Sequence, residues 1–297
     1  VKVSILTLAY NVEKYIAQAV DSALMQQVDF DYEIVIGEDC STDRTREVIS
    51  DLCQKYPEKI RASFAETNGG YNKNLAQTLK TCRGDYVAVL DGDDYWTNPN
   101  KLQMQVDFLD QHPDCSSCFH NAQVIYEDGS RKPEYLCRAD QKEISTFEDI
   151  IADGFIWNTS VIVFRRGLFE DFPAWYYERR TLGDWLLHIL NAQHGDIGYI
   201  DEVMSVYRIH KGGTVGGLRY AQKLQAKIDF LDQINAHLGY RYDRHIKTSL
   251  SKCWVELADT LVEEGFQLGL ATNSDNVAEI FDHWLNPVPL PEAWKAQ

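Results

Sequence analysis

Residues 86–94 read Tyr-Val-Ala-Val-Leu-Asp-Gly-Asp-Asp, an apolar run that ends in three aspartates within four positions. Two like charges about 4 Å apart near a protein surface repel each other by roughly 4 kcal/mol. A cation bound between the carboxylates would offset this repulsion. Carboxylates without a neighbouring thiolate or imidazole suit a hard ion such as Mg²⁺ or Mn²⁺. The stretch therefore predicts a buried strand that ends at a divalent metal site.

The simplest alternative is that the Asp-Gly pair is only a hairpin turn, since this dipeptide is a favoured centre of tight hairpins. The following residues argue against a hairpin, because a helical pattern over Lys101–Leu109 takes the place of a second alternating strand. Thr97 or Asn98 is placed to cap that helix, with Pro99 at its first position. Acids between a strand and a helix lie at the sheet edge where open α/β proteins bind ligands.

Apolar strands alternate with amphipathic helices through the first part of the chain. Strands are predicted at Val3–Leu8, Tyr32–Ile36, Ile60–Ala65 and Tyr86–Leu90, each followed by apolar residues at helical spacing. The second helix is expected to be capped by Ser41 or Thr42. This alternation predicts an α/β fold with a mainly parallel sheet, right-handed crossovers and helices on both faces. Later strands are expected at Phe119–Tyr126, Ser160–Phe164 and Ile197–Ile209.

From about Leu218 to the end the pattern is helical. Three apolar stripes recur at helical spacing, and they begin at Ala221, Ile246 and Val277. We therefore expect two regions, an α/β domain over residues 1–217 and a helical region over residues 218–297. The stripes are expected to form ordinary core. A homodimer contact or a dock for the acceptor is the alternative use of the same helices.

The composition is that of a folded globular protein, with 44% hydrophobic and 25% charged residues among 297. The net charge of −16 argues against a nucleic acid partner, because phosphate backbones are bound through clusters of Lys and Arg. Seven cysteines without framework spacing indicate a reduced chain, and Cys115 and Cys118 are expected to be buried thiols. No run approaches the ~20 apolar residues of a membrane helix. A cytoplasmic protein, free or at the inner face of the membrane, is predicted.

Four short blocks occur in order along the strand and helix pattern. Ala9-Tyr10-Asn11 ends the first strand, Asp39–Asp43 follows the second, Asn68-Gly69-Gly70 follows the third and Asp91–Asp94 follows the fourth. Together the blocks resemble the family 2 glycosyltransferases with the GT-A fold, which transfer a sugar from a nucleotide diphosphate with inversion at the anomeric carbon. Weaker matches at Gly183-Asp184-Trp185 and Tyr207-Arg208-Ile209-His210 extend the resemblance toward residue 217.

The resemblance implies a site for the sugar donor at the ends of these strands. It assigns to that site Ala9, Tyr10, Glu13, Asp39, Lys73, Asp91 and Gly92. Tyr10 would stack on the nucleotide base, and Asp39 would accept a hydrogen bond from a base N–H. From the residues alone, Tyr10 also fits a core position and Asp39 a turn that caps the next helix. Glu13 also fits a first helical turn and Lys73 a solvated helix face.

The resemblance further implies Mn²⁺ or Mg²⁺ held by Asp93 and Asp94, with Asp91 on the metal or the ribose and His210 near the metal or the diphosphate. The cation would stabilise negative charge on the leaving nucleotide. Asp184 is implied as the base that takes the proton of the acceptor hydroxyl. The alternatives are that Asp184 only caps its helix and that His210 is structural.

The sequence thus predicts a metal-dependent inverting glycosyltransferase, hexosyl- or N-acetylhexosaminyl-transferring. By the resemblance, its donor is a UDP-sugar in preference to a GDP-sugar, and its acceptor is a glycan or lipid-linked glycan of the cell surface. A dehydrogenase and a phosphate-loop NTPase are excluded, because no Gly-x-Gly-x-x-Gly or Gly-Lys-Ser/Thr element is present. The remaining alternatives are a metal-dependent nucleotidyltransferase and a catalytically degenerate transferase that serves as a nucleotide-binding module or as a scaffold.

Overall fold

The computed structural model describes residues 1–153, 158–179, 181–213 and 219–267. These residues group into two compact units. One unit holds residues 1–150 with the described part of 154–216, and the other holds residues 151–153 with the described part of 217–297. The strands that the structure describes belong to the first unit. The predicted boundary between residues 217 and 218 lies outside the described residues and stays a prediction.

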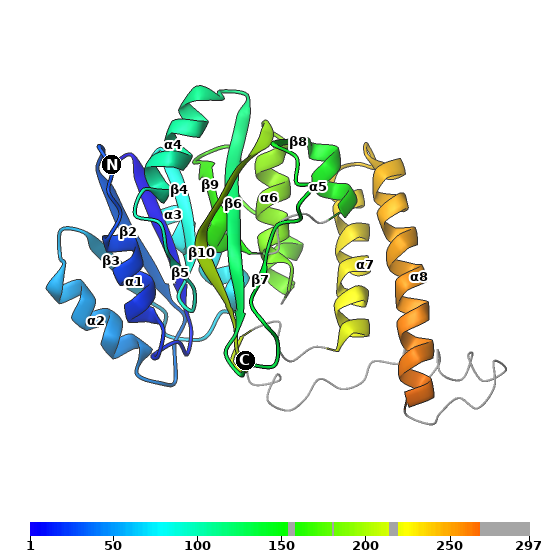
Figure 1. Cartoon of the computed structure of the whole chain (residues 1–297), viewed down its shortest axis with the longest axis horizontal. Helices are drawn as coiled ribbons and strands as arrows, with labels where there is room; N and C mark the ends of the chain where they lie inside the picture. The colour runs from blue at the N-terminus through cyan, green and yellow to red at the C-terminus, as the bar shows by residue number, and fades with distance from the viewer. Residues whose placement is uncertain (154–157, 180, 214–218, 268–297) are drawn as a thin grey trace. The chain divides into compact units, whose positions relative to one another are not determined.

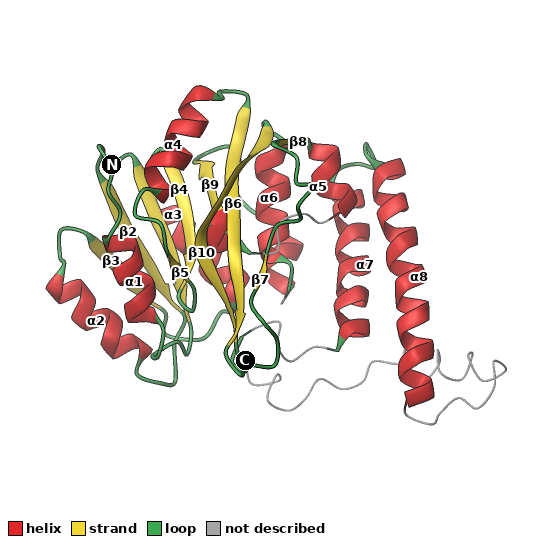
Figure 2. Ribbon diagram, viewed as in Figure 1, coloured by secondary structure: helices red, strands yellow, loops and turns green. Residues whose placement is uncertain are grey.

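The described strands form one ten-stranded sheet (Figure 2). They span Val3–Ala9 (β1), Tyr32–Glu38 (β2), Ile60–Phe64 (β3), Tyr86–Asp91 (β4), Tyr95–Trp96 (β5), Cys115–Tyr126 (β6), Glu134–Tyr135 (β7), Ile144–Ser145 (β8), Ile162–Arg165 (β9) and Asp196–Ile209 (β10). Their order is β3-β2-β1-β4-β9-β6-β10-β5, and β7 pairs with β6 while β8 pairs with β10.

β1 is central to the parallel half of this sheet. It pairs in parallel with β2 and β4, so that Ile5 lies between Ile34 and Ala88. Every residue of β1 and β2 is buried, as expected for parallel strands covered on both faces. β5, β7, β8 and β9 join antiparallel, over two or three residue pairs each time. The long ladders are therefore parallel, as predicted.

Helices cover both faces of the sheet. They span Ile16–Leu24 (α1), Thr45–Lys55 (α2), Tyr71–Thr81 (α3), Lys101–Gln111 (α4), Phe147–Asp153 (α5) and Gly183–Ala192 (α6), with 3₁₀ turns at Thr159–Val161 (η1) and Ala174–Glu178 (η2). On one face, Ile16 of α1, Ile49 of α2 and Leu102 of α4 share a hydrophobic core with Ile5 and Ile34. α3 packs on the opposite side of β1 and β2 (Figure 1). The carboxyl ends of β1 to β4 consequently meet at one sheet edge.

The predicted cap of the second helix is wrong. α2 begins at Thr45, and its first-turn N–H groups are not capped by Ser41 or Thr42; Asp43 Oδ1 accepts from Thr45 N at 2.9 Å instead. Ser41 and Thr42 instead bond Asn11, whose backbone N donates to Ser41 Oγ and whose Oδ1 accepts from Thr42 N.

α4 begins at Lys101, two residues beyond Pro99. The predicted cap residue Asn98 lies just before it, and its Oδ1 accepts from Asn100 N at 2.9 Å, the bond expected of a capping side chain. The two-residue strand β5 precedes it and pairs with β10. A short strand that the sequence pattern did not indicate therefore lies between the acidic stretch and the predicted helix.

The second unit contains α7 (Tyr220–His237) and α8 (Asp243–Gln267). The predicted stripes along both helices are mostly buried, with Ala221 and Ile246 at 5% and 0% exposure. Trp254, an apolar residue of the second stripe, is 45% exposed, because it lies one residue beyond the buried Cys253 and points to another side of α8. The stripe from Val277 lies outside the described residues.

Two expectations from composition can be compared with the structure. Cys115 and Cys118 are buried free thiols in β6, as predicted. Among the residues that the structure describes, no helix combines the length and the apolar character needed to cross a membrane.

Candidate active site

The predicted acidic cluster lies where β4 ends. Asp91 is the last residue of β4, and the chain then turns so that Asp94 N donates to Asp91 O. Gly92 N donates to Leu8 O at 2.9 Å, and a Cβ on Gly92 would lie 2.8 Å from that oxygen. Glycine is therefore required for the turn to lie directly against β1.

Asp94 is the buried member of the cluster, at 1% exposure. One oxygen, Oδ2, accepts from Ser160 Oγ at 2.7 Å and Asn158 Nδ2 at 2.9 Å, and the other accepts from Arg208 N at 2.9 Å. Burial raises the pKa of Asp94, and the neighbouring charge of Asp93 adds to the rise. Since both oxygens already accept hydrogen bonds, Asp94 ties the acidic turn to η1 and β10.

Asp91 has a different environment. Its Oδ2 accepts from Thr159 Oγ1 at 2.6 Å, and its backbone N donates to Ser160 Oγ at 3.1 Å. Its Oδ1 is buried and has no hydrogen-bond partner among the described residues. Burial, together with the charges of Asp94 and Asp93, raises the pKa of Asp91 well above its usual range. A buried carboxylate oxygen without a donor is a group that a cation would satisfy.

Asp93 faces His210 at the end of β10. His210 Nε2 lies 3.0 Å from Asp93 Oδ2, and this hydrogen bond raises the pKa of His210. The imidazole packs against the Tyr15 ring, with 4.8 Å between centroids. The guanidinium of Arg208 also packs against Tyr15, 4.7 Å from the ring centroid. Arg208 Nε donates to Asp93 O. The structure thus brings His210 and the acidic turn together.

The side chains of Asp91, Asp93 and His210 have the chemistry needed to bind a divalent cation. Asp91 and Asp93 offer carboxylate oxygens and His210 offers an imidazole nitrogen, a donor set that suits Mn²⁺. The fit rests on Asp91 Oδ1, the buried acceptor that the described part of the chain leaves unsatisfied. Within the same described ranges, no three His, Cys, Asp or Glu side chains are already grouped closely enough to hold a metal ion. The phosphate oxygens of a donor would have to complete the coordination.

Asp184 lies in the first turn of α6 and does not cap this helix. The N-cap residue is Leu182, which has a φ of 63°, and Asp184 Oδ1 accepts from the adjacent Trp185 N at 2.8 Å. The predicted capping alternative is therefore wrong. Burial raises the pKa of Asp184 to about 6. The charge of Asp184 also makes a small contribution to the raised pKa of Asp91, so the two carboxylates are close enough to interact electrostatically.

α3 determines where α6 begins. A Cβ on Gly183 would lie 1.9 Å from Asn72 Oδ1, so only glycine fits next to this α3 side chain. Asn72 Nδ2 donates to Tyr176 O at 2.8 Å, which fixes the amide. Tyr71, the preceding residue, has its hydroxyl 3.3 Å from Thr159 Oγ1. α3 therefore links the turn that carries Asp184 to the segment that holds Asp91.

The residues predicted to bind the donor differ in their burial and in their hydrogen-bond partners. Ala9 is buried, and its carbonyl accepts from Asp39 N. Tyr10 lies at the same strand end with intermediate exposure, so part of its ring is open to a ligand. Glu13 Oε2 accepts from Arg44 N at 2.8 Å, so it joins the chain after β1 to the start of α2. Lys73 is exposed and helps to line an open cavity of about 630 Å³.

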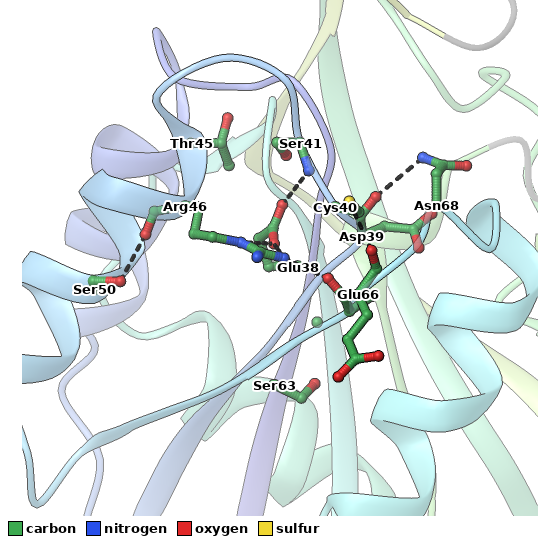
Figure 3. A network of polar contacts seen from close by, with 12 residues as sticks. Glu38, Asp39, Cys40, Ser41, Thr45, Arg46, Ser50, Ser63, Glu66 and Asn68 are labelled. Atoms are coloured by element: carbon green, nitrogen blue, oxygen red, sulfur yellow. Dashed lines mark hydrogen bonds and ion pairs between the residues drawn. The ribbon is translucent and has the colours of Figure 1, made fainter. Parts of the chain in front are cut away.

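Asp39 does not cap α2. Its two carboxylate oxygens accept from Gly69 N and Gly70 N, each at 2.8 Å, and burial raises its pKa. Asn68 donates through Nδ2 to Asp39 O at 3.0 Å (Figure 3). Asp39 therefore joins the end of β2 to the chain after β3.

Sequence reasoning missed Asn158, Thr159 and Ser160, which donate to Asp94 and Asp91. A signal for them was present, because three consecutive hydrogen-bonding residues stand directly before the apolar run of Val161–Phe164. No block of the resemblance includes them. Tyr15 and Arg208, which flank His210, were also not assigned a role.

Comparison with known proteins identifies the class to which this fold and site belong. Residues 4–171 match the family described as Glycosyl transferase family 2, which is more than half of the chain. The chain therefore belongs to the family 2 glycosyltransferases, as predicted.

Particular relatives share large parts of the chain. An uncharacterized protein of Mycobacterium tuberculosis is 38% identical over 210 residues, or 71% of this chain and 59% of that protein, so the chain spans less than two thirds of that relative. The crystal structure of Staphylococcus aureus TarS 1-349 in complex with UDP-GlcNAc has a TM-score of 0.63 at 22% identity, and the match covers 88% of this chain and 81% of the TarS 1-349 chain. TarS is named a poly(ribitol-phosphate) β-N-acetylglucosaminyltransferase.

A mannosyltransferase from Pyrobaculum calidifontis, PcManGT, in complex with GDP-Man and Mn²⁺, has a TM-score of 0.58 at 14% identity and covers 99% of this chain and 82% of its own. At these identities the two structures show the shared fold. The predicted GT-A-like α/β class is confirmed.

Proposed function

We propose that this chain is an inverting glycosyltransferase that uses Mn²⁺ or Mg²⁺ to transfer a hexosyl or N-acetylhexosaminyl group from a nucleotide diphosphate sugar. The observation that carries the proposal is the buried, unsatisfied Asp91 Oδ1 beside Asp93, at the sheet edge of a family 2 fold. A UDP-sugar is the favoured donor, because the TarS structure with this fold contains UDP-GlcNAc. PcManGT, crystallised with Mn²⁺, supports the choice of cation.

Asp91, Asp93 and His210 would hold the cation. When bound, the cation would neutralise charge that develops on the leaving nucleotide. Asp94 keeps the acidic turn in place through its bonds to Ser160, Asn158 and Arg208. Arg208 also places a positive charge beside Asp93, since its Nε donates to Asp93 O.

Asp184 would be the catalytic base. The acceptor oxygen attacks the anomeric carbon from the side opposite the phosphate, its proton passes to the Asp184 carboxylate, and the bond between the sugar carbon and the phosphate oxygen breaks. A pKa near 6 leaves Asp184 ionised at neutral pH while keeping it a useful proton acceptor. Displacement from the opposite side inverts the anomeric configuration.

The proposed acceptor is a hydroxyl of a cell-surface polysaccharide or glycan. The name of TarS supports this choice of acceptor, because it gives poly(ribitol phosphate), a hydroxyl-rich polymer, as the acceptor of that relative. The reaction is proposed to take place in the cytoplasm or at the inner membrane face, where nucleotide sugars are made.

A thermal shift assay with UDP or GDP, each with and without Mn²⁺, tests the proposal. We expect UDP with Mn²⁺ to raise the melting temperature more than UDP alone, because the cation joins the diphosphate to Asp91 and Asp93. Asp91→Asn should lose this gain, whereas Asp107→Asn on the exposed face of α4 should keep it. Absence of any nucleotide-dependent shift in the unmodified protein would favour the scaffold alternative, and a panel of nucleotide sugars would then show no donor hydrolysis.

A further inference from the structure

β2 ends in two adjacent buried acids whose side chains bond different parts of the fold. Successive residues of a strand point to opposite faces. Glu38 has a fully buried side chain that bonds residues of the chain leading into α2, whereas Asp39 bonds the chain that follows β3. Figure 3 shows both acids with Ser41, Arg46 and Asn68.

Arg46 is the charged partner of Glu38. Its Nη2 lies 2.6 Å from Glu38 Oε2, and its Nε donates to the same oxygen at 2.8 Å. Nη2 of Arg46 also donates to Ala65 O, the first residue after β3. The planar guanidinium has five N–H donors in a rigid fork, so one side chain serves both acceptors. Arg46 therefore connects α2, β2 and the chain after β3.

The segment of residues 65–70 is fixed to the end of β2 at several points. Ala65 N donates to Glu38 O at 2.9 Å, and Asn68 Nδ2 donates to Asp39 O at 3.0 Å. Gly69 N and Gly70 N both donate to the Asp39 carboxylate. Gly70 has a φ of 80°, which favours glycine and directs the chain into α3.

This segment forms one wall of an open cavity of about 630 Å³. Asn68 and Gly69 line it together with Lys73 of α3. Asp39, to which the segment is bonded, stands beside Ala9 at the strand ends where the donor is proposed to bind.

We propose that Arg46 is a positioning residue for the nucleotide of the donor. It acts at a distance, by holding Ala65 and Glu38 so that residues 65–70 present a fixed wall to the nucleotide. The inference rests on the proposed function, since it assigns this cavity wall to the donor. Lysine at this position would keep the ion pair with Glu38 but could not also reach Ala65 O with a rigid fork.

Arg46→Lys tests the inference, and Arg61→Lys is its matched control. Arg61 pairs with Glu33 at 2.9 Å and donates to Thr81 O at 2.9 Å, so it has the same kind of partners. Glu33 and Arg61 lie near the amino ends of β2 and β3, at the edge opposite the proposed site. Both variants should therefore lose comparable stability, and only Arg46→Lys should weaken the binding of the nucleotide.

The measurements are the Kd of UDP with Mn²⁺ and hydrogen exchange of the backbone amides of residues 65–71. We expect the Kd to rise about tenfold in Arg46→Lys, the effect of losing one charge-assisted hydrogen bond, and to stay within about twofold in Arg61→Lys. Exchange at Gly69 and Gly70 should accelerate only in Arg46→Lys. A role in stability alone would lower the melting temperature in both variants and leave the Kd unchanged.

The outcomes separate this inference from the proposed function. An unchanged Kd in Arg46→Lys overturns the inference and leaves the proposed function intact, whether or not exchange accelerates. If the unmodified protein binds neither UDP nor GDP with Mn²⁺, the proposed function fails and the nucleotide role of Arg46 fails with it. Accelerated exchange with a raised Kd, absent in the control, supports the inference.

Discussion

Asp91, Asp93 and Asp94 stand within four residues, yet their carboxylates have different partners. Three donors occupy Asp94, His210 faces Asp93, and Asp91 retains a buried oxygen that no described residue satisfies. The sequence pattern assigned all three to the metal. The structure favours a division in which Asp91 and Asp93 are available to a cation and Asp94 organises the turn. Only the partners of each side chain, which come from distant segments, distinguish these roles.

At the residue scale, Asp184→Asn should keep the fold and lose turnover. Asparagine cannot accept the proton, so we expect kcat to fall by roughly 10²-fold or more. In the unmodified enzyme, kcat should decline as the pH falls below about 6, because protonation of Asp184 removes the base. Rates measured across pH, with melting curves of both proteins, check this. Asp107→Asn is the control, and near-normal turnover of Asp184→Asn would reject the assignment.

Ser160→Ala should be destabilising although Ser160 is a small side chain. Its hydroxyl donates to Asp94 Oδ2 in a buried bond and accepts from Asp91 N in a partly buried one. We expect a loss of about 1–3 kcal/mol in the free energy of unfolding, since Asp91 N would lose its acceptor and the buried Asp94 carboxylate one of its three donors. Urea denaturation measures this loss. Ser130→Ala, on an exposed turn, should change little, and equal stability of the two variants would contradict the role given to Ser160.

At the element scale, the strand and helix pattern predicted most of the parallel sheet. β1 to β4 and α1 to α4 follow the expected order because each element has its own apolar periodicity. Helix starts were less predictable: Ser41 bonds Asn11 in place of α2, which is a contact between loops that no local pattern encodes. The short strand β5 depends on pairing with β10, more than a hundred residues later.

The candidate active site shows the same difference between features with a local sequence pattern and contacts between distant segments. Asp91, Asp93 and His210 were predicted from blocks of the resemblance, and the structure brings them together. Asn158 and Thr159 were missed because their importance lies in which carboxylates they reach, and this depends on where β9 joins the sheet. Sequence therefore predicted the acidic residues better than the donors that hold them.

Gly183→Ala should disturb the junction between α3 and α6. The new Cβ would lie 1.9 Å from Asn72 Oδ1, and the bonds of Asn72 to Tyr176 O and Arg179 O leave that amide little freedom to move. We expect a cost of about 1–3 kcal/mol in stability, typical of overpacking, and a lower kcat because Asp184 is the next residue. Gln193→Ala, at the exposed far end of α6, is the control. Unchanged stability of Gly183→Ala would show that this contact is not tight.

At the scale of the whole molecule, charge is the main constraint on function. The chain has 45 acidic and 29 basic residues, a net charge of −16. The anionic nucleotide sugar of the proposed function would approach against this field, and a bound divalent cation would offset part of the repulsion. The described units contribute no helix suited to span a membrane, and the chain covers 59% of its M. tuberculosis relative.

The stabilising effect of Mn²⁺ should increase with pH. The pKa values of Asp91 and Asp94 are raised, so between the ordinary pKa of an aspartate and these raised values the folded protein binds more protons than the unfolded chain. The metal-free protein therefore loses stability as the pH rises through that interval. A cation replaces those protons. The rise in melting temperature with Mn²⁺ should therefore be larger at about pH 7.5 than at about pH 5.5. Asp91→Asn should show little dependence, and an effect of Mn²⁺ that is equal at both pH values would contradict this linkage.

The most direct test is an anomalous difference map from crystals grown with UDP and Mn²⁺. We predict a manganese peak within about 2.5 Å of carboxylate oxygens of Asp91 and Asp93, with the UDP diphosphate on its open side. Bound UDP with no manganese peak at these two side chains would contradict the proposed metal site.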